Sequence, residues 1–359
     1  MKILVLSPHP EGFVPGQRLK YEQYFNYFRQ NGIEIEVSSF ISADFQKIIY
    51  KRGYLFLKFF YTLKGYCRRI RDIFRIRNYD GLYIFLYVTP FGFPLFEWIF
   101  TKIQPNFIYD IDDLVFLKRE SKANKIADLV RGKSKINFLI KRAQHVVVCT
   151  PFLHEYVRKY NLNSTDISST VNTDIYRPND VNNKHEELTI GWSGSHSTSP
   201  YLLLLEDVLS KIQSKYLVKI LVIGDSDFQT HKFQFEAIAW NKDKEVEDLN
   251  RIDIGIYPLP SEKWVLGKSG LKAIQYMALG KPTVATAIGA NFRVIEHNIS
   301  GFLVTKDLEW FQTIENLILS PKLRIEIGRK GRERVENLFS VEANKNKYLD
   351  IILKLKKEC

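Results

Sequence analysis

Short apolar runs alternate with amphipathic segments along this chain, and loops that contain glycine or proline separate them. The first repeat has an apolar run at 2–6, a loop with Gly12 and Gly16, a helical segment at 19–30 and a second apolar run at 33–38. The order strand, loop, helix, strand predicts a βαβ unit. Such a loop places backbone amides and a helix N-terminus beside the strand end, where an anion can bind. Turn geometry alone would also explain the two glycines.

Apolar runs of similar length predict further parallel strands on both sides of a polar break. The break covers residues 176–187, which lose their periodicity and indicate a linker. The expected strands lie at 82–88, 107–111 and 145–149 before the linker, and at 188–192, 218–223, 252–257 and 283–286 after it. The expected helices of the second half lie at 201–213, 271–279 and 341–357. The pattern therefore predicts two successive α/β units of similar size.

Residues 81–100 form the most apolar stretch of the chain, and Glu97 is its only charged residue. Its length would allow a membrane-spanning helix. However, the stretch is divided by Pro90, Gly92 and Pro94. These residues favour a buried strand, a loop and the start of a helix, so we expect no membrane span here.

The composition is that of a globular protein. Of the 359 residues, 45% are hydrophobic and 26% are charged, which excludes a disordered or collagen-like chain. Cysteine occurs only at Cys67, Cys149 and Cys359, without a CxxC pair. This argues against a disulfide scaffold and a cysteine zinc site, and it suits a reducing cytoplasm. No secretory signal is recognisable either, so we expect a cytoplasmic protein.

Positive charge is concentrated in the first half of the chain. The net charge is +12, and residues 1–180 hold 27 Lys+Arg against 17 Asp+Glu, whereas residues 181–359 hold 25 against 23. Residues 51–77 alone hold nine basic residues, one acid (Asp72) and many interleaved aromatic and aliphatic residues. Such a segment is typical of a helix at an anionic membrane surface. A nucleic-acid patch, and a core helix whose basic side chains extend to solvent, stay open as alternatives.

One long segment resembles a known family. Residues 267–304, GKSGLKAIQYMALGKPTVATAIGANFRVIEHNISGFLV, resemble the C-terminal signature of the GT-B fold, family 4 retaining glycosyltransferases. The positions in register are Tyr276, Met277, Ala278, Gly280, Pro282 and residues 301–304. Three other segments agree with the family, namely VVVCTPFLHEYV, STVNTDIYRP and DIGIYPLP. The resemblance therefore extends over nearly the whole chain.

The resemblance implies an α/β architecture with two Rossmann-like domains that face a central cleft. Residues 1–176 would be the N-terminal acceptor-binding domain, joined by a C-terminal helix at 341–359 that crosses back to it. Residues 186–340 would be the nucleotide-sugar-binding domain. The implied reaction is metal-independent and retaining, and it moves a sugar from a nucleotide diphosphate to a glycan or polyprenyl-diphosphate-linked acceptor in cell-envelope polysaccharide synthesis.

The donor motif departs from the family pattern. The family has two glutamates eight positions apart, and here these positions hold Gly267 and Gln275. Gln275 can still hydrogen-bond ribose hydroxyls, because an amide both donates and accepts. Around Gly267 the chain resembles a subgroup of envelope-polysaccharide transferases with the motif W-x-x-G-K-x-x-x-K before the helix, which places Lys268 and Lys272 near the donor.

Lysines at a helix start suit a leaving diphosphate, because ammonium groups and backbone amides both oppose its negative charge. We predict Lys268 as a catalytic residue that stabilises the leaving group. Lys272, Ser269, Gly270 and Leu271 are predicted to contact the donor with it. The alternative is that the two lysines, four residues apart, are a solvated helix face.

Other donor contacts are implied by position. The loop after the strand at 188–192 contributes Ser193, Gly194 and Ser195, which offer only hydroxyl and amide groups. Gly16 and Arg18 occupy the place of the family's N-terminal glycine loop. Trp240 lies where the family lines the nucleobase, although it would also fit as a core residue.

An acidic triplet ends the strand at 107–111. Asp110, Asp112 and Asp113 could hold a divalent metal, as in the other major transferase fold, GT-A. The resemblance to GT-B instead places Asp112 where the family often has histidine. There it would contact the sugar or orient the acceptor, and we predict it as catalytic, with no metal. Helix capping by Asp112 or Asp113 is the structural alternative.

These arguments predict a UDP- or GDP-linked sugar as substrate and no cofactor. The expected partners are a glycan or lipid-linked acceptor and the anionic inner face of the cell membrane, without nucleic acid. Two other classes stay open, a non-catalytic GT-B scaffold and a basic nucleic-acid-binding protein. The sequence leaves open the base, the sugar, the acceptor, the linkage and the oligomeric state.

Overall fold

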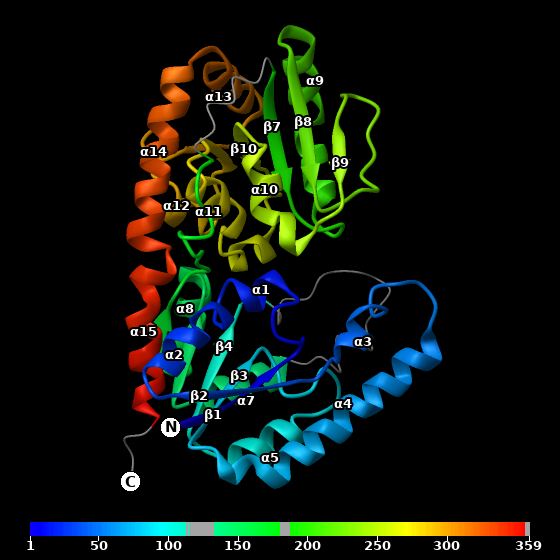
Figure 1. Ribbon diagram of the computed structural model, residues 1–359, viewed down its shortest axis with the longest axis vertical. Coiled ribbons are helices and arrows are strands. Elements are labelled where there is room, and N and C mark those ends of the chain that lie inside the picture. The colour runs from blue at the N-terminus through cyan, green and yellow to red at the C-terminus, as the bar shows by residue number, and fades with distance from the viewer. Residues whose placement is uncertain (113, 115–132, 180–186, 356–359) are drawn as a thin grey trace. The chain divides into compact units, whose positions relative to one another are not determined.

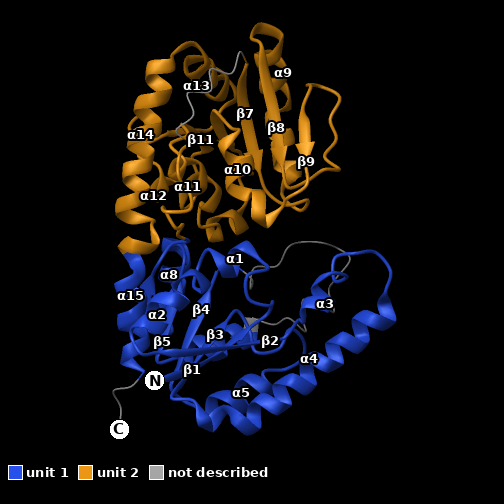
Figure 2. Ribbon diagram, in the orientation of Figure 1, with its two compact units in different colours: residues 1–169, 344–359 blue, residues 170–343 orange. Residues whose placement is uncertain are grey.

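The computed structural model describes residues 1–112, 114, 133–179 and 187–355. The chain folds into two compact units, which Figure 2 colours separately. Unit 1 comprises residues 1–169 and 344–359, and unit 2 comprises residues 170–343. Residues 170–176, expected in the first domain, belong to unit 2, where the backbone N–H of Val171 donates to the carbonyl of Phe339 at 3.0 Å.

Unit 1 is built on a six-stranded parallel sheet in the order β2-β1-β3-β4-β5-β6 (Figure 1). Its strands are β1 (Lys2–Ser7), β2 (Glu34–Ser39), β3 (Gly81–Phe85), β4 (Phe107–Ile111), β5 (His145–Val148) and β6 (Ser164–Asp166). Every residue of β3 and β4 is buried, which explains their unbroken apolar runs. Residues 81–100 therefore contain a strand, a loop and the start of a helix, as predicted.

The helices of unit 1 lie on both faces and along the edge of this sheet. They are α1 (Pro15–Arg18), α2 (Phe25–Gln30), α3 (Ala43–Gln46), α4 (Leu55–Arg75), α5 (Leu95–Ile103), α7 (Lys133–Arg142), α8 (Pro151–Arg158) and α15 (Val341–Lys354). The predicted helix at 19–30 is wrong in extent, since α1, a 3₁₀ turn and α2 replace it. Lys20 and Tyr21, which lie between α1 and the 3₁₀ turn, are both buried.

The last helix, α15, begins in unit 2 and continues into unit 1. Its buried side chains include Tyr348, Ile351 and Ile352. The rings of Tyr348 and Tyr24 are 4.5 Å apart, and both side chains are fully buried. This contact fastens the C-terminal helix to the N-terminal sheet unit.

Unit 2 has its own six-stranded parallel sheet in the order β12-β11-β10-β7-β8-β9. The strands are β7 (Leu188–Ser193), β8 (Val218–Ile223), β9 (Glu236–Ile238), β10 (Ile254–Tyr257), β11 (Thr283–Thr286) and β12 (Phe302–Val304). The chain enters at β7, adds β8 and β9 on one side, and then returns to the other side with β10. This is the doubly wound order, whose switch point between β7 and β10 is where such sheets bind ligands.

Helices cover both faces of the second sheet. They are α9 (Glu206–Lys215), α10 (Glu245–Asn250), α11 (Leu271–Ala278), α12 (Asn291–Val294), α13 (Asp307–Leu319) and α14 (Pro321–Leu338). Helices α9 and α13 pack on each other, as do α11 and α14. The core between strands and helices includes Ile190, Trp192, Leu209, Ile256 and Ile314, none of which is exposed. Within the described parts of both units, no helix combines the length and the apolar character needed to cross a membrane.

Candidate functional site

The switch point of unit 2 begins at the carboxyl end of β7. Ser193 is buried there, and its backbone N–H donates to the Tyr276 hydroxyl oxygen at 2.7 Å. The two hydroxyl oxygens are 2.9 Å apart. Ser193 therefore fastens the loop to α11, while the following Ser195 is exposed. Of the predicted loop residues, Ser193 has a structural partner and Ser195 faces solvent.

Two glycines allow the loops of the switch point to come close. A Cβ atom on Gly194 would lie 2.4 Å from the Nζ of Lys272 and 2.4 Å from the Trp192 ring. Gly224, after β8, has a φ of +104°, and a Cβ there would lie 1.9 Å from the carbonyl oxygen of Gly194. Any side chain at Gly194 would displace Lys272, so the glycine makes room for the ammonium group.

Lys272 lies at the carboxyl ends of β7 and β10. Its Nζ donates to the Thr198 hydroxyl at 3.3 Å and lies 4.3 Å from the Trp192 ring centroid and 5.5 Å from that of Tyr257. Loss of hydration, and then the charge of Lys268, lower the pKa of Lys272 to about 7. The structure therefore holds a lysine at the switch point whose charged form is destabilised by burial and by a neighbouring cation.

Lys268 precedes the same helix. Its Nζ lies 5.5 Å from the Trp264 ring centroid. Gly270 caps α11 with a φ of +79°, and a Cβ there would come within 2.9 Å of the Val294 side chain. Lys268 and Ser269 thus lie before the helix, and Leu271 and Lys272 lie in its first turn. The structure brings the predicted lysines together at one helix start, while their role in catalysis stays a prediction.

A buried carboxylate that the sequence did not indicate joins two other predicted residues. Glu245 accepts from the Tyr176 hydroxyl at 3.0 Å, from Gln275 Nε2 at 3.3 Å and from Trp240 Nε1 at 3.4 Å. Gln275 Nε2 also donates to the Tyr176 hydroxyl at 3.1 Å. Trp240 is 38% exposed, so it is not a core residue. Glu245 and Tyr176 come from distant segments, and no local spacing could have linked them to Gln275.

In unit 1 the structure brings Gly16 and Asp112 together. A Cβ on Gly16 would lie 2.8 Å from Asp112 Oδ2, so the carboxylate lies directly against α1. The Cys149 thiol donates to the Asp112 carbonyl at 2.9 Å. Arg18 ends α1 and is partly exposed. The structure therefore places Gly16 beside Asp112 at the carboxyl end of β4, while their roles stay a prediction.

Asp110 has a structural role. Its carboxylate is fully buried, forms an ion pair with Lys20 at 2.5 Å and accepts from the Tyr83 hydroxyl. Burial alone would lower the pKa of Lys20, but the charge of Asp110 raises it above its ordinary value. Asp113 lies outside the described residues. Among the described residues, no group of three or more His, Cys, Asp or Glu side chains is placed to hold a metal ion.

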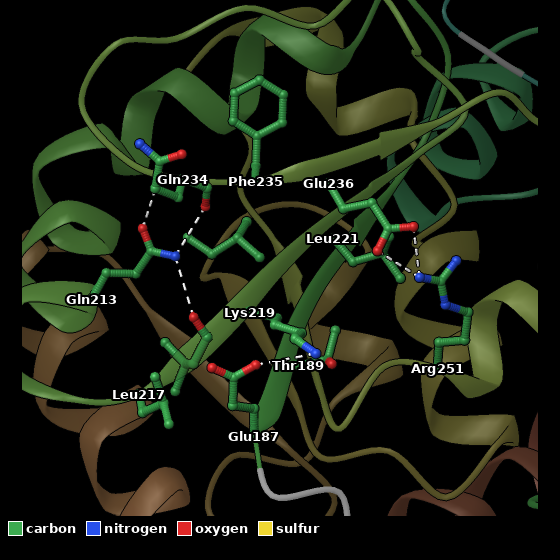
Figure 3. A pocket seen from close by; sticks show the side chains of 12 residues that line it. Glu187, Thr189, Gln213, Leu217, Lys219, Leu221, Gln234, Phe235, Glu236 and Arg251 are labelled. Atoms are coloured by element: carbon green, nitrogen blue, oxygen red, sulfur yellow. Dashed lines mark hydrogen bonds and ion pairs between the residues drawn. The ribbon is translucent and has the colours of Figure 1, made fainter.

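A cavity of about 830 Å³ lies elsewhere in unit 2 (Figure 3). It is at the amino ends of β7 and β8, opposite to the switch point, and it contains none of the predicted donor residues. Its charged side chains pair with each other: Lys219 with Glu187 at 3.1 Å, and Arg251 with Glu236 at 2.6 Å. The predicted donor residues Lys268 and Lys272 thus lie away from this cavity.

Known proteins resemble part of this chain in sequence. Residues 187–320 match the family described as glycosyl transferases group 1. Over 141 residues the chain is 28% identical to the capsular polysaccharide biosynthesis glycosyltransferase CapM of Staphylococcus aureus. This match covers 36% of each protein. Matches to curated relatives span between 18% and 36% of the relatives' length.

Solved structures match the whole chain. A glycosyltransferase from Rickettsia africae superposes with a TM-score of 0.69 at 17% identity. The match covers 100% of this chain and 99% of that protein. HepE from Anabaena, solved in complex with UDP-glucose, has a TM-score of 0.70 at 14% identity, with coverage of 99% and 100%. These likenesses establish the fold of both units. The chain thus has the GT-B fold, and its residues 187–320 match the family of glycosyl transferases group 1.

Proposed function

We propose that the protein is a glycosyltransferase that moves a sugar from a UDP- or GDP-linked donor to a glycan or polyprenyl-diphosphate-linked acceptor in cell-envelope polysaccharide synthesis. It acts in the cytoplasm at the inner face of the membrane. Unit 2 binds the nucleotide sugar and unit 1 binds the acceptor. The group 1 domain, and relatives such as CapM whose name states a capsular polysaccharide role, support this proposal.

The pair Lys268 and Lys272 carries the proposal. Lys272 lies at the switch point of a doubly wound sheet with a pKa of about 7 and next to a second lysine. Two like charges near one helix start are unfavourable alone, but a diphosphate there neutralises both. The arrangement therefore suits an anionic ligand with more than one charge.

The chemistry follows from that placement. Charge on the leaving diphosphate grows as the glycosidic bond breaks, so fixed ammonium groups bind the transition state more strongly than the ground state. The acceptor hydroxyl attacks the sugar on the face from which the diphosphate departs, and this retains the anomeric configuration. A departing phosphate oxygen takes the proton of the hydroxyl. Asp112 contacts the sugar or orients the acceptor hydroxyl. No metal ion is required in this scheme, because the lysines and helix amides neutralise the leaving group.

A ligand panel with purified protein tests the proposal. A nucleotide sugar at 100 times its dissociation constant should stabilise the protein by about 2.7 kcal/mol, visible as a raised melting temperature. Hydrolysis or transfer of the same donor should persist in EDTA. Loss of activity in EDTA with recovery in manganese would contradict the metal-independent mechanism.

The absence of the two family glutamates favours a second candidate, a GT-B scaffold without catalysis. Gly267 offers no side chain, and the Gln275 amide is engaged by Tyr176 and Glu245. Such a scaffold would bind nucleotide sugars with the same thermal shift but would release no nucleotide diphosphate. Measured release of UDP or GDP with a suitable acceptor excludes it.

A further inference from the structure

Helix α4 has its polar side turned inward. Successive residues of a helix are 100° apart, so Gly65, Arg69 and Asp72 share one face, and all three are buried. The Arg69 guanidinium donates to the carbonyl groups of Val88 at 2.8 Å and Ser7 at 3.1 Å and forms an ion pair with Asp72 at 3.1 Å. These bonds fix which way the helix faces.

The opposite face of α4 is apolar and exposed along its whole length. Its large side chains are Phe56, Phe59, Phe60, Leu63, Ile70 and Phe74. Phe56 is 81% exposed and Phe74 is 83% exposed, at opposite ends of the helix. Apolar surface of this extent on a folded protein marks an interaction site.

A second segment beside α4 also exposes large apolar side chains. Helices α4 and α5 pack side by side (Figure 1). The Tyr66 hydroxyl donates to the carbonyl of Phe91 at 3.0 Å, and the Tyr66 ring lies 5.6 Å from that of Phe96. The adjoining loop and helix start expose Phe93, Leu95 and Trp98, of which Phe93 is 89% exposed. We call the exposed side chains of residues 55–74 and 91–98 the aromatic face.

The exposed charges of these two segments are of one sign. Lys64 and Arg71 are exposed beside the apolar stripe, and the Lys64 ammonium lies 4.5 Å from the Phe60 ring centroid. The acids of these two segments are Asp72 and Glu97, and both are fully buried in ion pairs with Arg69 and Lys135. The face therefore presents hydrophobic groups surrounded by positive charge and no exposed carboxylate from these segments.

We propose that the aromatic face lies in the interfacial layer of an anionic phospholipid bilayer, with α4 parallel to the membrane plane. The aromatic side chains enter the headgroup and acyl boundary, and the flanking lysines and arginines contact lipid phosphates. This inference rests on the proposed function, in which the acceptor is lipid-linked, and adds the surface of the protein that contacts the lipid. A second copy of the chain fits less well, because pairing two such faces would bring like charges together.

Vesicle sedimentation tests the proposal with the full chain. Wild type should bind vesicles with about 30% phosphatidylglycerol and release them as salt rises. The variant Lys64→Ser/Arg71→Ser should lower the partition coefficient about 30-fold, since each basic residue contributes a factor of about 5. The variant Phe56→Ser/Phe60→Ser/Phe74→Ser should lower it by at least ~10-fold. Arg69 is left intact because it holds the helix in place.

Matched controls come from unit 2. Leu319→Ser/Ile325→Ser removes exposed apolar side chains of similar exposure, and Lys215→Ser/Lys232→Ser removes two exposed lysines. Both should bind vesicles as wild type does. Trp98 fluorescence should shift to shorter wavelength on vesicle addition, and Trp98→Phe should remove that shift.

Three results would overturn the inference. The first is vesicle binding by the Phe variant that equals wild type. The second is a wild-type dimer in solution that the Phe variant converts to monomer, which would assign the face to a second copy. The third is nucleic-acid binding that depends on the same residues without vesicle binding. Nucleotide-sugar hydrolysis, measured in parallel without vesicles, should be unchanged in every variant, so failure of the proposed function is seen separately.

Discussion

Each unit places a lysine near the carboxyl ends of its central strands, and the two lysines have opposite surroundings. Lys20 in unit 1 is fully buried and forms an ion pair with Asp110 at 2.5 Å. Lys272 in unit 2 is paired with no acidic group among the described residues, and its charged neighbour is Lys268. The comparison teaches that a buried ion pair makes the loss of either partner costly, whereas burial without a counter-ion lowers the pKa of a lysine.

Replacing each lysine by methionine should give the largest difference. Lys20→Met leaves Asp110 as a buried, uncompensated carboxylate and should lower the free energy of unfolding by about 3–5 kcal/mol. Lys272→Met removes an unfavourable charge and should leave stability unchanged or raise it. Urea unfolding of both variants measures this. Lys20→Met/Asp110→Asn should recover part of the loss, and equal destabilisation by both single variants would erase the contrast.

For the reaction rate we expect the opposite contrast, because the lysines of unit 2 should matter for kcat more than for stability. Lys268→Ala is expected to lower kcat by about 10²–10³, the effect of losing one preorganised donor to a leaving group. Donor affinity should fall less, and Lys268→Arg should recover only part of the rate, because a planar guanidinium does not replace a compact ammonium. Steady-state kinetics on soluble donor check this.

Lys272→Ala should lower kcat on a similar scale, since its ammonium lies at the switch point itself. Lys263→Ala, which removes an exposed lysine from the same segment, is the matched control and should behave as wild type. Near-normal turnover of a folded Lys268→Ala enzyme would show that Lys268 is a solvated residue that only tunes Lys272.

The stability of unit 2 should depend on pH through Lys272. Its pKa is about 7 in the folded state and 10.5 in the unfolded chain, so between these values the unfolded state binds more protons. Stability therefore rises with pH across this window, and the penalty is fully present below pH 7. Thermal unfolding at several pH values should show that Lys272→Met raises the melting temperature most on the acid side. A constant difference from pH 6 to 10 would contradict the lowered pKa.

The smallest expected effect is a proton taken up with the donor. A diphosphate beside Lys272 favours its charged form, so binding near pH 8 should consume up to about one proton. Calorimetry in buffers of different ionisation enthalpy measures this uptake. Lys272→Met should lose it while retaining weaker binding, whereas an uptake that persists in the variant would assign the proton to another group.

Much of the fold could be predicted because its signals are local. The runs at 107–111, 218–223 and 283–286 coincide with β4, β8 and β11. The three-residue strands β6, β9 and β12 were missed, because so short a run has no readable period. The predicted helix at 19–30 ends where expected, but its first part was wrong, since regular α-helix begins only at Phe25. Lys20, in that first part, pairs with Asp110, which is 90 residues away in the sequence.

The candidate site was predictable in position but not in its pairings. The motif placed Lys268, Lys272 and Gln275 around one helix start, and α11 begins at Leu271 as expected. Nothing in the sequence showed that Gln275 would contact Glu245 and Tyr176, or that Gly16 would lie against Asp112. Those contacts join segments that are distant along the chain.

The sequence by itself determined the alternation of strands and helices, the two-unit architecture, the concentration of positive charge in residues 51–77 and the motif of the donor helix. These follow from periodicity and residue type, which act over a few neighbours. Only the tertiary structure decided that Lys20 pairs with a carboxylate and that Lys272 has no such partner among the described residues. It also decided that α4 turns its phenylalanines outward. Burial and charge pairing depend on groups that the fold brings from afar, and Arg69 orients α4 through carbonyl groups of β1 and of the loop after β3.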